Sequence, residues 1–168
     1  MERLSNPHFH RQWIIDELKK IEFDSLLEVG CGDGENLYWI QKAFPNVKLA
    51  GIDTDDDRMN VIRTEMPSVE VLKADVGNIP FDDKSFDIVL SDAVLMYVRE
   101  INPAINEIER VAKKAIILSE LNTDSNVDNM AHFKNYKKLF GDKLTIIRKI
   151  IGWGAPWDNG GALMIKKL

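Results

Sequence analysis

Acidic residues occur at regular intervals along this chain, where short apolar segments end. Glu28, Asp53, Asp75, Asp92 and Glu120 each lie at or just beyond the end of an expected strand. Open parallel sheets bind ligands beyond the carboxyl ends of their strands, so we expect these carboxylates to share one rim. Neighbouring carboxylates repel one another unless a cation or hydrogen-bond donors lie among them. The pattern therefore indicates a ligand with positive charge and hydroxyl groups.

Three alternate glycines follow the first of these carboxylates, in the segment LLEVGCGDGEN at residues 26–36. Gly30, Gly32 and Gly34 allow a sharp turn and a close approach to a ligand, and the helix that follows presents free N–H groups. The dinucleotide fingerprint G-x-G-x-x-G would require glycine at position 35, where the chain has Glu35, so NAD is disfavoured. The segment predicts a nucleoside-cofactor loop, with a purely structural tight turn as the alternative.

Length and composition indicate one domain that spans residues 1–168, with residues 1–21 as an N-terminal helical cap segment. The 168 residues are 45% hydrophobic, which suffices for a full core. No apolar run approaches the roughly 20 residues needed to span a bilayer, and MERLSNPHFH has no signal-peptide core. We therefore expect a cytoplasmic protein with no membrane partner.

Charge and cysteine content exclude several kinds of site. The net charge of −5 disfavours DNA and bulk RNA, because nucleic-acid affinity depends on many Lys and Arg contacts to phosphates. Cys31 is the only cysteine, so an internal disulfide is excluded and a thiolate-rich metal site is disfavoured. We expect no metal, and we expect Cys31 to pack inside the glycine loop.

Short apolar runs alternate with helical patterns, which predicts an α/β fold with a mostly parallel sheet and helices on both faces. Helical stripes occur at Leu37, Ile40 and Phe44 and again from Ile101 to Ala112, and an N-terminal helix is expected from about His8 to Ile21. The loop between the last two expected strands is too short for a parallel crossover, so those two strands should pair antiparallel. Seven strands are expected, at 26–29, 47–53, 69–75, 86–91, 115–120, 143–151 and 161–167.

The order of these segments resembles class I S-adenosylmethionine (SAM) dependent methyltransferases over nearly the whole chain. E-x-G-x-G-x-G at 28–34 resembles motif I, GIDTD at 51–55 the post-I motif, and residues 73–98 the adenine-contact segment followed by motif IV. The resemblance implies a single three-layer Rossmann-like domain whose seven-stranded sheet has one antiparallel strand. It also implies SAM as cofactor and S-adenosylhomocysteine as product.

The same resemblance assigns roles along the cofactor. Asp53, 19 residues beyond Gly34, should accept both ribose hydroxyls. Asp75 and the Val76 backbone N–H should contact the adenine, and Glu28 should organise the amino-acid end. The complete set of implied cofactor-binding residues is Glu28, Gly30, Cys31, Gly32, Asp33, Gly34, Asp53, Thr54, Asp75, Val76, Ser91 and Asp92.

Methyl transfer depends largely on alignment and desolvation, but a hydroxyl acceptor also needs a base within hydrogen-bond reach. Candidates near the methyl group are Asp92, Tyr97 and Glu120. Tyr97 stands where the resembling small-molecule enzymes often have histidine. His8, His10 and His132 lie on expected helices that could cover the acceptor pocket, although surface or capping roles are commoner for such residues.

The acceptor is expected to be a small molecule, such as a sugar or another hydroxyl or amine compound. The chain lacks the N-P-P-Y or D-P-P-Y tetrad of base and glutamine methyltransferases, and it has no large insertion to hold a macromolecule. Trp153 and Trp157 could stack on the acceptor or form a lid. Two alternatives remain: a catalytically silent SAM-binding protein or subunit of a heteromeric methyltransferase, and another nucleotide-binding protein. We expect a monomer or homodimer.

Overall fold

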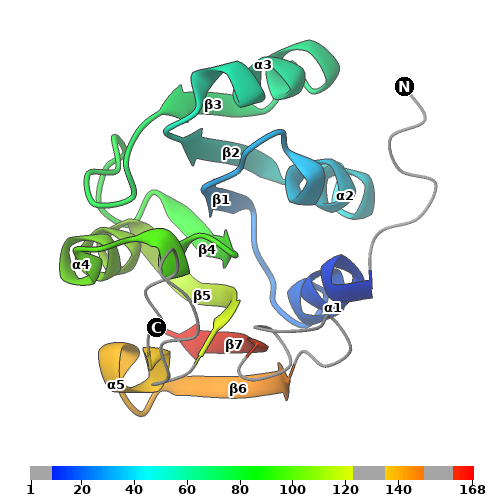
Figure 1. Ribbon diagram of the computed structural model, residues 1–168. Coiled ribbons are helices and arrows are strands. Elements are labelled where there is room, and N and C mark those ends of the chain that lie inside the picture. The colour runs from blue at the N-terminus through cyan, green and yellow to red at the C-terminus, as the bar shows by residue number, and fades with distance from the viewer. Residues whose placement is uncertain (1–8, 123–134, 150–160) are drawn as a thin grey trace.

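The computed structural model describes residues 9–122, 135–149 and 161–168, which build a seven-stranded sheet flanked by helices (Figure 1). The longest described helix has 11 residues, and none of the described helices is long and apolar enough to cross a membrane. In chain order the elements are α1 (Phe9–Leu18), β1 (Ser25–Val29), α2 (Glu35–Ala43), β2 (Lys48–Asp53), α3 (Asp56–Glu65), β3 (Glu70–Lys73), β4 (Phe86–Asp92), the 3₁₀ helix η1 (Leu95–Tyr97), α4 (Ile101–Val111), β5 (Ala112–Leu121), α5 (Tyr136–Phe140), β6 (Leu144–Lys149) and β7 (Gly161–Lys167).

The strand order is β3-β2-β1-β4-β5-β7-β6. β1 pairs parallel with both β2 and β4, and the β2–β3 and β4–β5 pairs are also parallel. β7 pairs antiparallel with β5 on one side and with β6 on the other, so it alone runs against the other six strands. The expected mostly parallel sheet with one antiparallel strand is confirmed.

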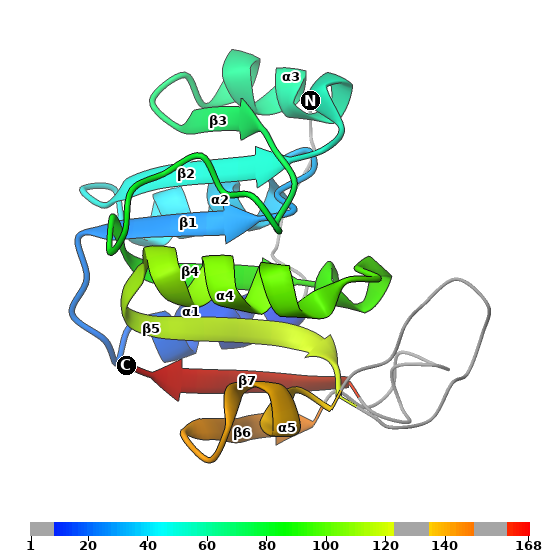
Figure 2. The same ribbon diagram turned by 90° about the vertical axis from the view of Figure 1, so that its left-hand side faces the viewer.

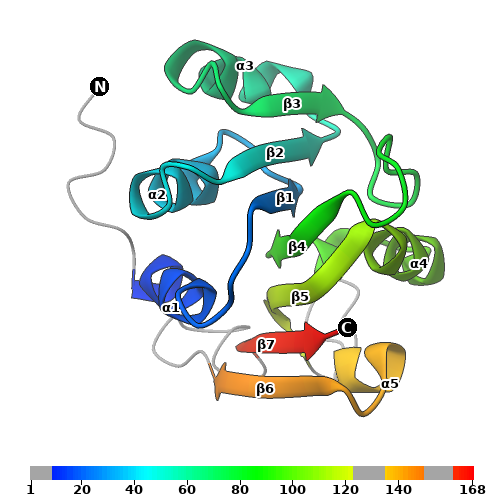
Figure 3. The ribbon, with the colours of Figure 1, turned by 180° about the vertical axis from the view of Figure 1, so that it is seen from behind.

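Helices cover both faces of the sheet and give the fold three layers (Figures 2 and 3). Apolar side chains of α1, α2 and α3 pack with Ile88 and Leu90 of β4 on one face. Those of α4 and α5 pack with Val89 on the other face. Because successive side chains of a strand point to opposite faces, a strand buried on both sides must be apolar at nearly every position. This explains the continuous apolar runs in the sequence.

Several element boundaries differ from the expected ones. The strand expected at 69–75 ends at Lys73, because Asp75 turns the chain by accepting a hydrogen bond from the Gly77 N–H at 2.7 Å. The described N-terminal helix ends at Leu18 rather than Ile21, and Ala112 begins β5 instead of ending a helix. The expected ends His8 and Ile151, and the residues His132, Trp153 and Trp157, lie outside the described residues.

Candidate functional site

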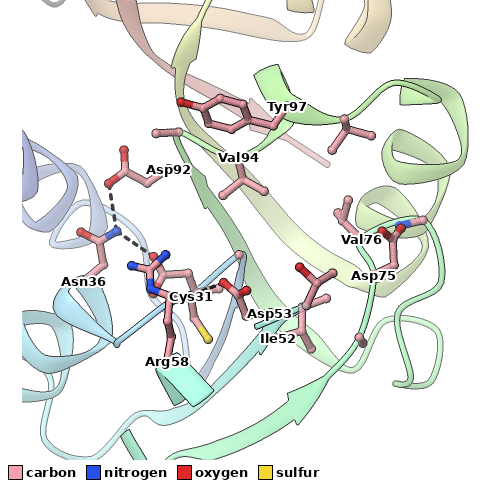
Figure 4. Close-up of a pocket in the computed structure, with 18 of the residues that line it drawn as sticks. Cys31, Asn36, Ile52, Asp53, Arg58, Asp75, Val76, Asp92, Val94 and Tyr97 are labelled. Atoms are coloured by element: carbon pink, nitrogen blue, oxygen red, sulfur yellow. Dashed lines mark hydrogen bonds between the residues drawn. The ribbon is translucent and has the colours of Figure 1, made fainter. Parts of the chain in front are cut away.

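A cavity of about 1030 Å³ lies at the carboxyl ends of β1, β2 and β4 (Figure 4). In the strand order, β2 and β3 lie on one side of β1, and β4 and β5 lie on the other side, so the order reverses between β1 and β4. Such a topological switch point opens a crevice between neighbouring strands, which is where open α/β sheets bind ligands. The cavity wall includes Glu28, Asp53, Asp75 and Asp92, four of the five carboxylates expected at this rim.

The glycine loop forms the floor of the cavity, and all three of its glycines have positive φ angles. At Gly30, with φ of 69°, an added Cβ would lie only 2.2 Å from the Val94 side chain. Side chains rarely tolerate either the backbone conformation or that contact. Gly30 therefore lets the loop after β1 pack directly against the loop after β4.

Asp53 holds the glycine loop against the end of β2. Its Oδ2 accepts a hydrogen bond from the Gly32 N–H at 2.7 Å, and its Oδ1 accepts one from the Asp55 N–H at 2.8 Å. Each carboxylate oxygen can accept a second hydrogen bond, so both oxygens retain capacity for a ligand diol. Asp55 caps α3, because its side chain accepts a hydrogen bond from the Arg58 N–H.

Asn36 of α2 joins two carboxylates at the opposite end of the cavity (Figure 4). Its Nδ2 donates to Glu28 Oε1 at 2.7 Å and to Asp92 Oδ2 at 3.0 Å. Asp92 Oδ2 also lies 3.2 Å from His10 Nε2 of α1. Burial alone would raise the pKa of Asp92, but the hydrogen bonds and charge of His10 and the bond from Asn36 lower it below its usual value. Asp92 is therefore ionised at neutral pH.

The pKa of Glu28 is shifted in the opposite direction to that of Asp92. Burial raises the pKa of its carboxyl to about 8, an effect that the Asn36 bond reduces and the nearby Asp92 charge increases. Three buried polar atoms in this region have no partner among the described residues: Glu28 Oε2, Asn36 Oδ1 and Arg11 Nε. An unpaired buried polar atom costs roughly 1–3 kcal/mol, so this end of the cavity is suited to a ligand with both donors and acceptors.

Two arginines from neighbouring helices reach the cavity. Arg58 of α3 lies over Gly32 and is 3.5 Å from Asp33 Oδ1, and Arg11 of α1 pairs with Glu35. The sequence did not identify Arg11, Arg58 or Asn36, because a helix can bring any of its residues to a site. The polar Asn36 directly before the apolar stripe of α2 was the one available signal.

The far end of the cavity is less polar. Ile52 and Thr54 line it beside Asp75 and the buried Val76, as expected for a pocket that holds a flat ring. Tyr97 of η1 also lines the wall and is 58% exposed (Figure 4). Most of the expected residues thus line one cavity.

Three predicted site residues, Gly34, Ser91 and Glu120, are not part of the cavity wall. Two of them, Ser91 and Glu120, contact each other instead. Both are fully buried, and Ser91 Oγ donates to Glu120 Oε1 at 2.7 Å. Burial raises the pKa of Glu120 to about 7, although hydrogen bonds from Ser91, Val94 and Leu95 oppose this rise. The structure therefore does not bring Glu120 together with Asp92 and Tyr97 at the predicted catalytic position. Cys31 does line the wall, and burial raises the pKa of its thiol, so the thiol stays protonated.

The fold agrees with comparison to known proteins. The family model described as "Methyltransferase domain" matches residues 27–118, from the strand before the glycine loop to β5. The chain belongs to this methyltransferase family.

Individual relatives act on different acceptors. The chain is 33% identical over 73 residues to a fatty-acid O-methyltransferase of Mycolicibacterium smegmatis, a match that covers 42% of this chain and 27% of that protein. It is 31% identical over 98 residues to a ubiquinone/menaquinone biosynthesis C-methyltransferase of Campylobacter jejuni, covering 55% of this chain and 42% of the relative. The match thus spans less than half of each relative. A SAM-dependent methyltransferase structure from Aquifex aeolicus shares the fold, with a TM-score of 0.66 at 18% identity over 94% of this chain and 87% of that one.

Proposed function

We propose that this protein binds SAM in the cavity and transfers its methyl group to a small-molecule acceptor, such as a sugar or another hydroxyl or amine compound. The observation that carries the proposal is a group of buried polar atoms beside the glycine loop that have no partner in the described part of the chain: Glu28 Oε2, Asn36 Oδ1 and Arg11 Nε. The amino-acid end of SAM supplies an ammonium and a carboxylate, which complement an acceptor-rich and donor-containing pocket.

The charge of the cavity supports a cationic ligand. Seven acidic side chains line it against three arginines, Arg11, Arg58 and Arg99, and the acidic groups outnumber the arginines even with Glu28 protonated. A sulfonium is favoured in such surroundings, whereas the pyrophosphate of a dinucleotide would be repelled. When bound, SAM supplies an electrophilic methyl group with a good leaving group.

Different residues would contact different parts of SAM. Asp53 would accept the ribose hydroxyls, and Asp75 with the Val76 N–H would recognise the adenine. Gly30, Gly32 and Asp33 would line the methionine portion, with Cys31 and Gly34 shaping the loop and Thr54 beside the ring. Ser91 would act through its backbone carbonyl, because its side chain is engaged with Glu120.

Asp92 is the proposed proton acceptor for a hydroxyl-bearing acceptor. It lines the cavity, its pKa is lowered, and Asn36 and His10 hold it in place. Tyr97 would contact the acceptor with its exposed ring at the cavity rim. Exclusion of water and alignment of the acceptor would supply the remaining acceleration.

The first experiment is a calorimetric titration of ligand-stripped protein with SAM, with NAD as the control ligand. Micromolar SAM binding without NAD binding is expected. Asp53→Ala should abolish SAM binding. The matched control is Asp55→Ala, which removes the α3 cap two residues away: it should leave SAM binding within about threefold and lower stability by about 1 kcal/mol. Unchanged SAM affinity in Asp53→Ala would overturn the ribose assignment.

Turnover is then tested with a panel of polyols, sugars, phenols and amines, and by slow hydrolysis of SAM. Product formation with any of these supports the proposed activity. SAM binding without turnover, together with a stable protein partner in pull-downs, would instead identify a silent or heteromeric subunit. Failure of the folded protein to bind SAM would refute the proposal as a whole.

A further inference from the structure

Glu120 is a buried carboxyl group to which the proposed methyl transfer assigns no contact with either ligand. It lies near the end of β5, fully buried, and it faces the loop that follows β4. One of its oxygens, Oε1, accepts three hydrogen bonds: from Ser91 Oγ at 2.7 Å and from the Val94 and Leu95 N–H groups at 3.0 Å each. All three donors belong to the end of β4 or to the loop after it.

That loop is strained and needs external support. Ala93 has a φ of 57°, a left-handed conformation that costs a residue other than glycine on the order of 1–3 kcal/mol. The Ala93 N–H donates to the Ser119 carbonyl at 2.9 Å, so β5 already holds the loop at that point. The next two N–H groups, of Val94 and Leu95, both donate to Glu120 Oε1.

The supported loop forms part of the cavity wall. Val94, Tyr97 and Val98 line the cavity, and Val94 contacts the glycine loop at Gly30. The Tyr97 N–H donates to the Val94 carbonyl at 2.9 Å, so the backbone of Val94 helps to hold the backbone of Tyr97. A shift of Val94 would therefore change both the glycine-loop contact and the acceptor side of the cavity.

We propose that Glu120 is a positioning residue, which holds the loop at residues 93–97 through Oε1 and thereby fixes the wall against which the acceptor is aligned. The inference rests on the proposed methyl transfer for its catalytic consequence but not for the loop geometry. It replaces a direct acid–base role for Glu120, because the carboxyl does not reach the cavity. A misplacement of about 1 Å in such a wall can lower turnover by a factor of about 100.

The test compares two substitutions of similar volume, Glu120→Gln and Glu120→Leu. Gln keeps an acceptor oxygen where Oε1 lies, whereas Leu leaves Ser91, Val94 and Leu95 without an acceptor. Hydrogen exchange of the Val94 and Leu95 amides in ligand-free protein reports the loop directly. SAM affinity and acceptor kinetics are measured on the same variants.

Glu120→Gln should keep amide protection within about threefold, keep the pH profile of kcat and rescue turnover to near the wild-type rate. Glu120→Leu should speed exchange of both amides at least about tenfold and lower kcat at least about tenfold, with SAM affinity changed less than about fivefold. Loss of activity in Glu120→Gln would overturn the proposal and return Glu120 to an acid–base role.

Unchanged Val94 and Leu95 exchange in Glu120→Leu would also overturn the proposal. If Glu120→Leu does not fold, the exchange and activity of Glu120→Gln still decide the matter. The outcome is separable from the proposed function, because amide exchange needs neither SAM nor an acceptor. Absence of SAM binding by the wild-type protein would refute methyl transfer and leave the loop measurement valid.

Discussion

SAM binding should be coupled to loss of a proton from Glu28. In ligand-free protein, burial raises the pKa of this carboxyl to about 8, so about nine-tenths of the molecules carry the proton at pH 7. Its Oε2 lies buried without a partner among the described residues. An ammonium or sulfonium beside it would favour the ionised form and lower that pKa. The group must then release its proton when the cation binds.

The magnitude follows from the two groups that titrate. At pH 7 Glu28 should release about 0.9 proton, and a ligand amine with a pKa of about 7.8 should take up about 0.1, because most of it is already protonated. The net release is about 0.8 proton. At pH 9 Glu28 is already ionised and the amine must be protonated, so the sign reverses to a net uptake of about 0.8. SAM affinity should be greatest near pH 8, should fall about 2.5-fold by pH 7, and should then approach a tenfold fall, or about 1.4 kcal/mol, per pH unit below pH 7.

Calorimetry in buffers of different ionisation enthalpy measures this proton count. Glu28→Gln should bind SAM more weakly and should lose the release at pH 7. His10 lines the same cavity, so His10→Asn is measured alongside to assign the proton to Glu28. A proton count that keeps the same sign at pH 7 and pH 9, or a release that persists in Glu28→Gln, would refute the assignment of the cation to this carboxyl.

The same shift predicts the stability of the ligand-free protein. Because the folded state raises the pKa of Glu28 above its usual 4.5, folding retains the proton, and the stability that it contributes is complete below pH 4.5. That contribution is lost as pH rises to about 8, by an amount on the order of a few kcal/mol. Glu28→Gln should therefore raise the Tm of ligand-free protein at pH 8 and leave it nearly unchanged at pH 4. Equal effects at both pH values would contradict this reasoning.

Three further substitutions test other parts of the site and the core. Gly30→Ala should abolish SAM binding in calorimetry, because its Cβ would overlap Val94; wild-type affinity would refute the close packing of the two loops. Asp92→Asn should leave SAM affinity within about threefold and lower kcat for a hydroxyl acceptor about 100-fold, and equal kcat would exclude Asp92 as the base. Ile88→Ala should lower the free energy of unfolding by about 2–5 kcal/mol in urea titration, since Ile88 is fully buried in the central strand; a loss under 1 kcal/mol would contradict its core position.

The sheet could be predicted from the sequence because its strands are buried on both faces and therefore apolar along their length. Asp53 and Asp92 could be predicted as site residues for a related reason: polar side chains that end such strands must lie at the carboxyl edge of the sheet. Their positions at strand ends were enough to place them at one edge of the sheet, and both line the same cavity.

Residues on helices could not be predicted in the same way. Arg11 and Asn36 enter the cavity because α1 packs beside α2, and only the packed structure fixes that arrangement. Glu120 is the opposite case, a residue that the sequence proposed for the site and that the structure places outside the cavity wall. Its place at the end of a strand suggested a catalytic carboxylate, but the loop after β4 covers it and uses it as an acceptor. The end of a strand indicates which residues lie at the carboxyl edge of the sheet, and the conformation of the loops decides which of these residues a ligand can reach.

Strand β7 pairs with β5, the strand that carries Glu120, and so connects the support of the cavity wall to a distant part of the chain. It lies between β5 and β6 and pairs with β5 residues some forty to fifty positions earlier, including Glu120 opposite Ala162. Within the described residues, β6 joins the sheet only through β7. Opening of β7 would therefore release β6 with it and uncover the edge of the strand that carries Glu120. Because this pairing joins residues far apart in the chain, we expect it to form late in folding and the acceptor wall to acquire its final shape only after it is complete.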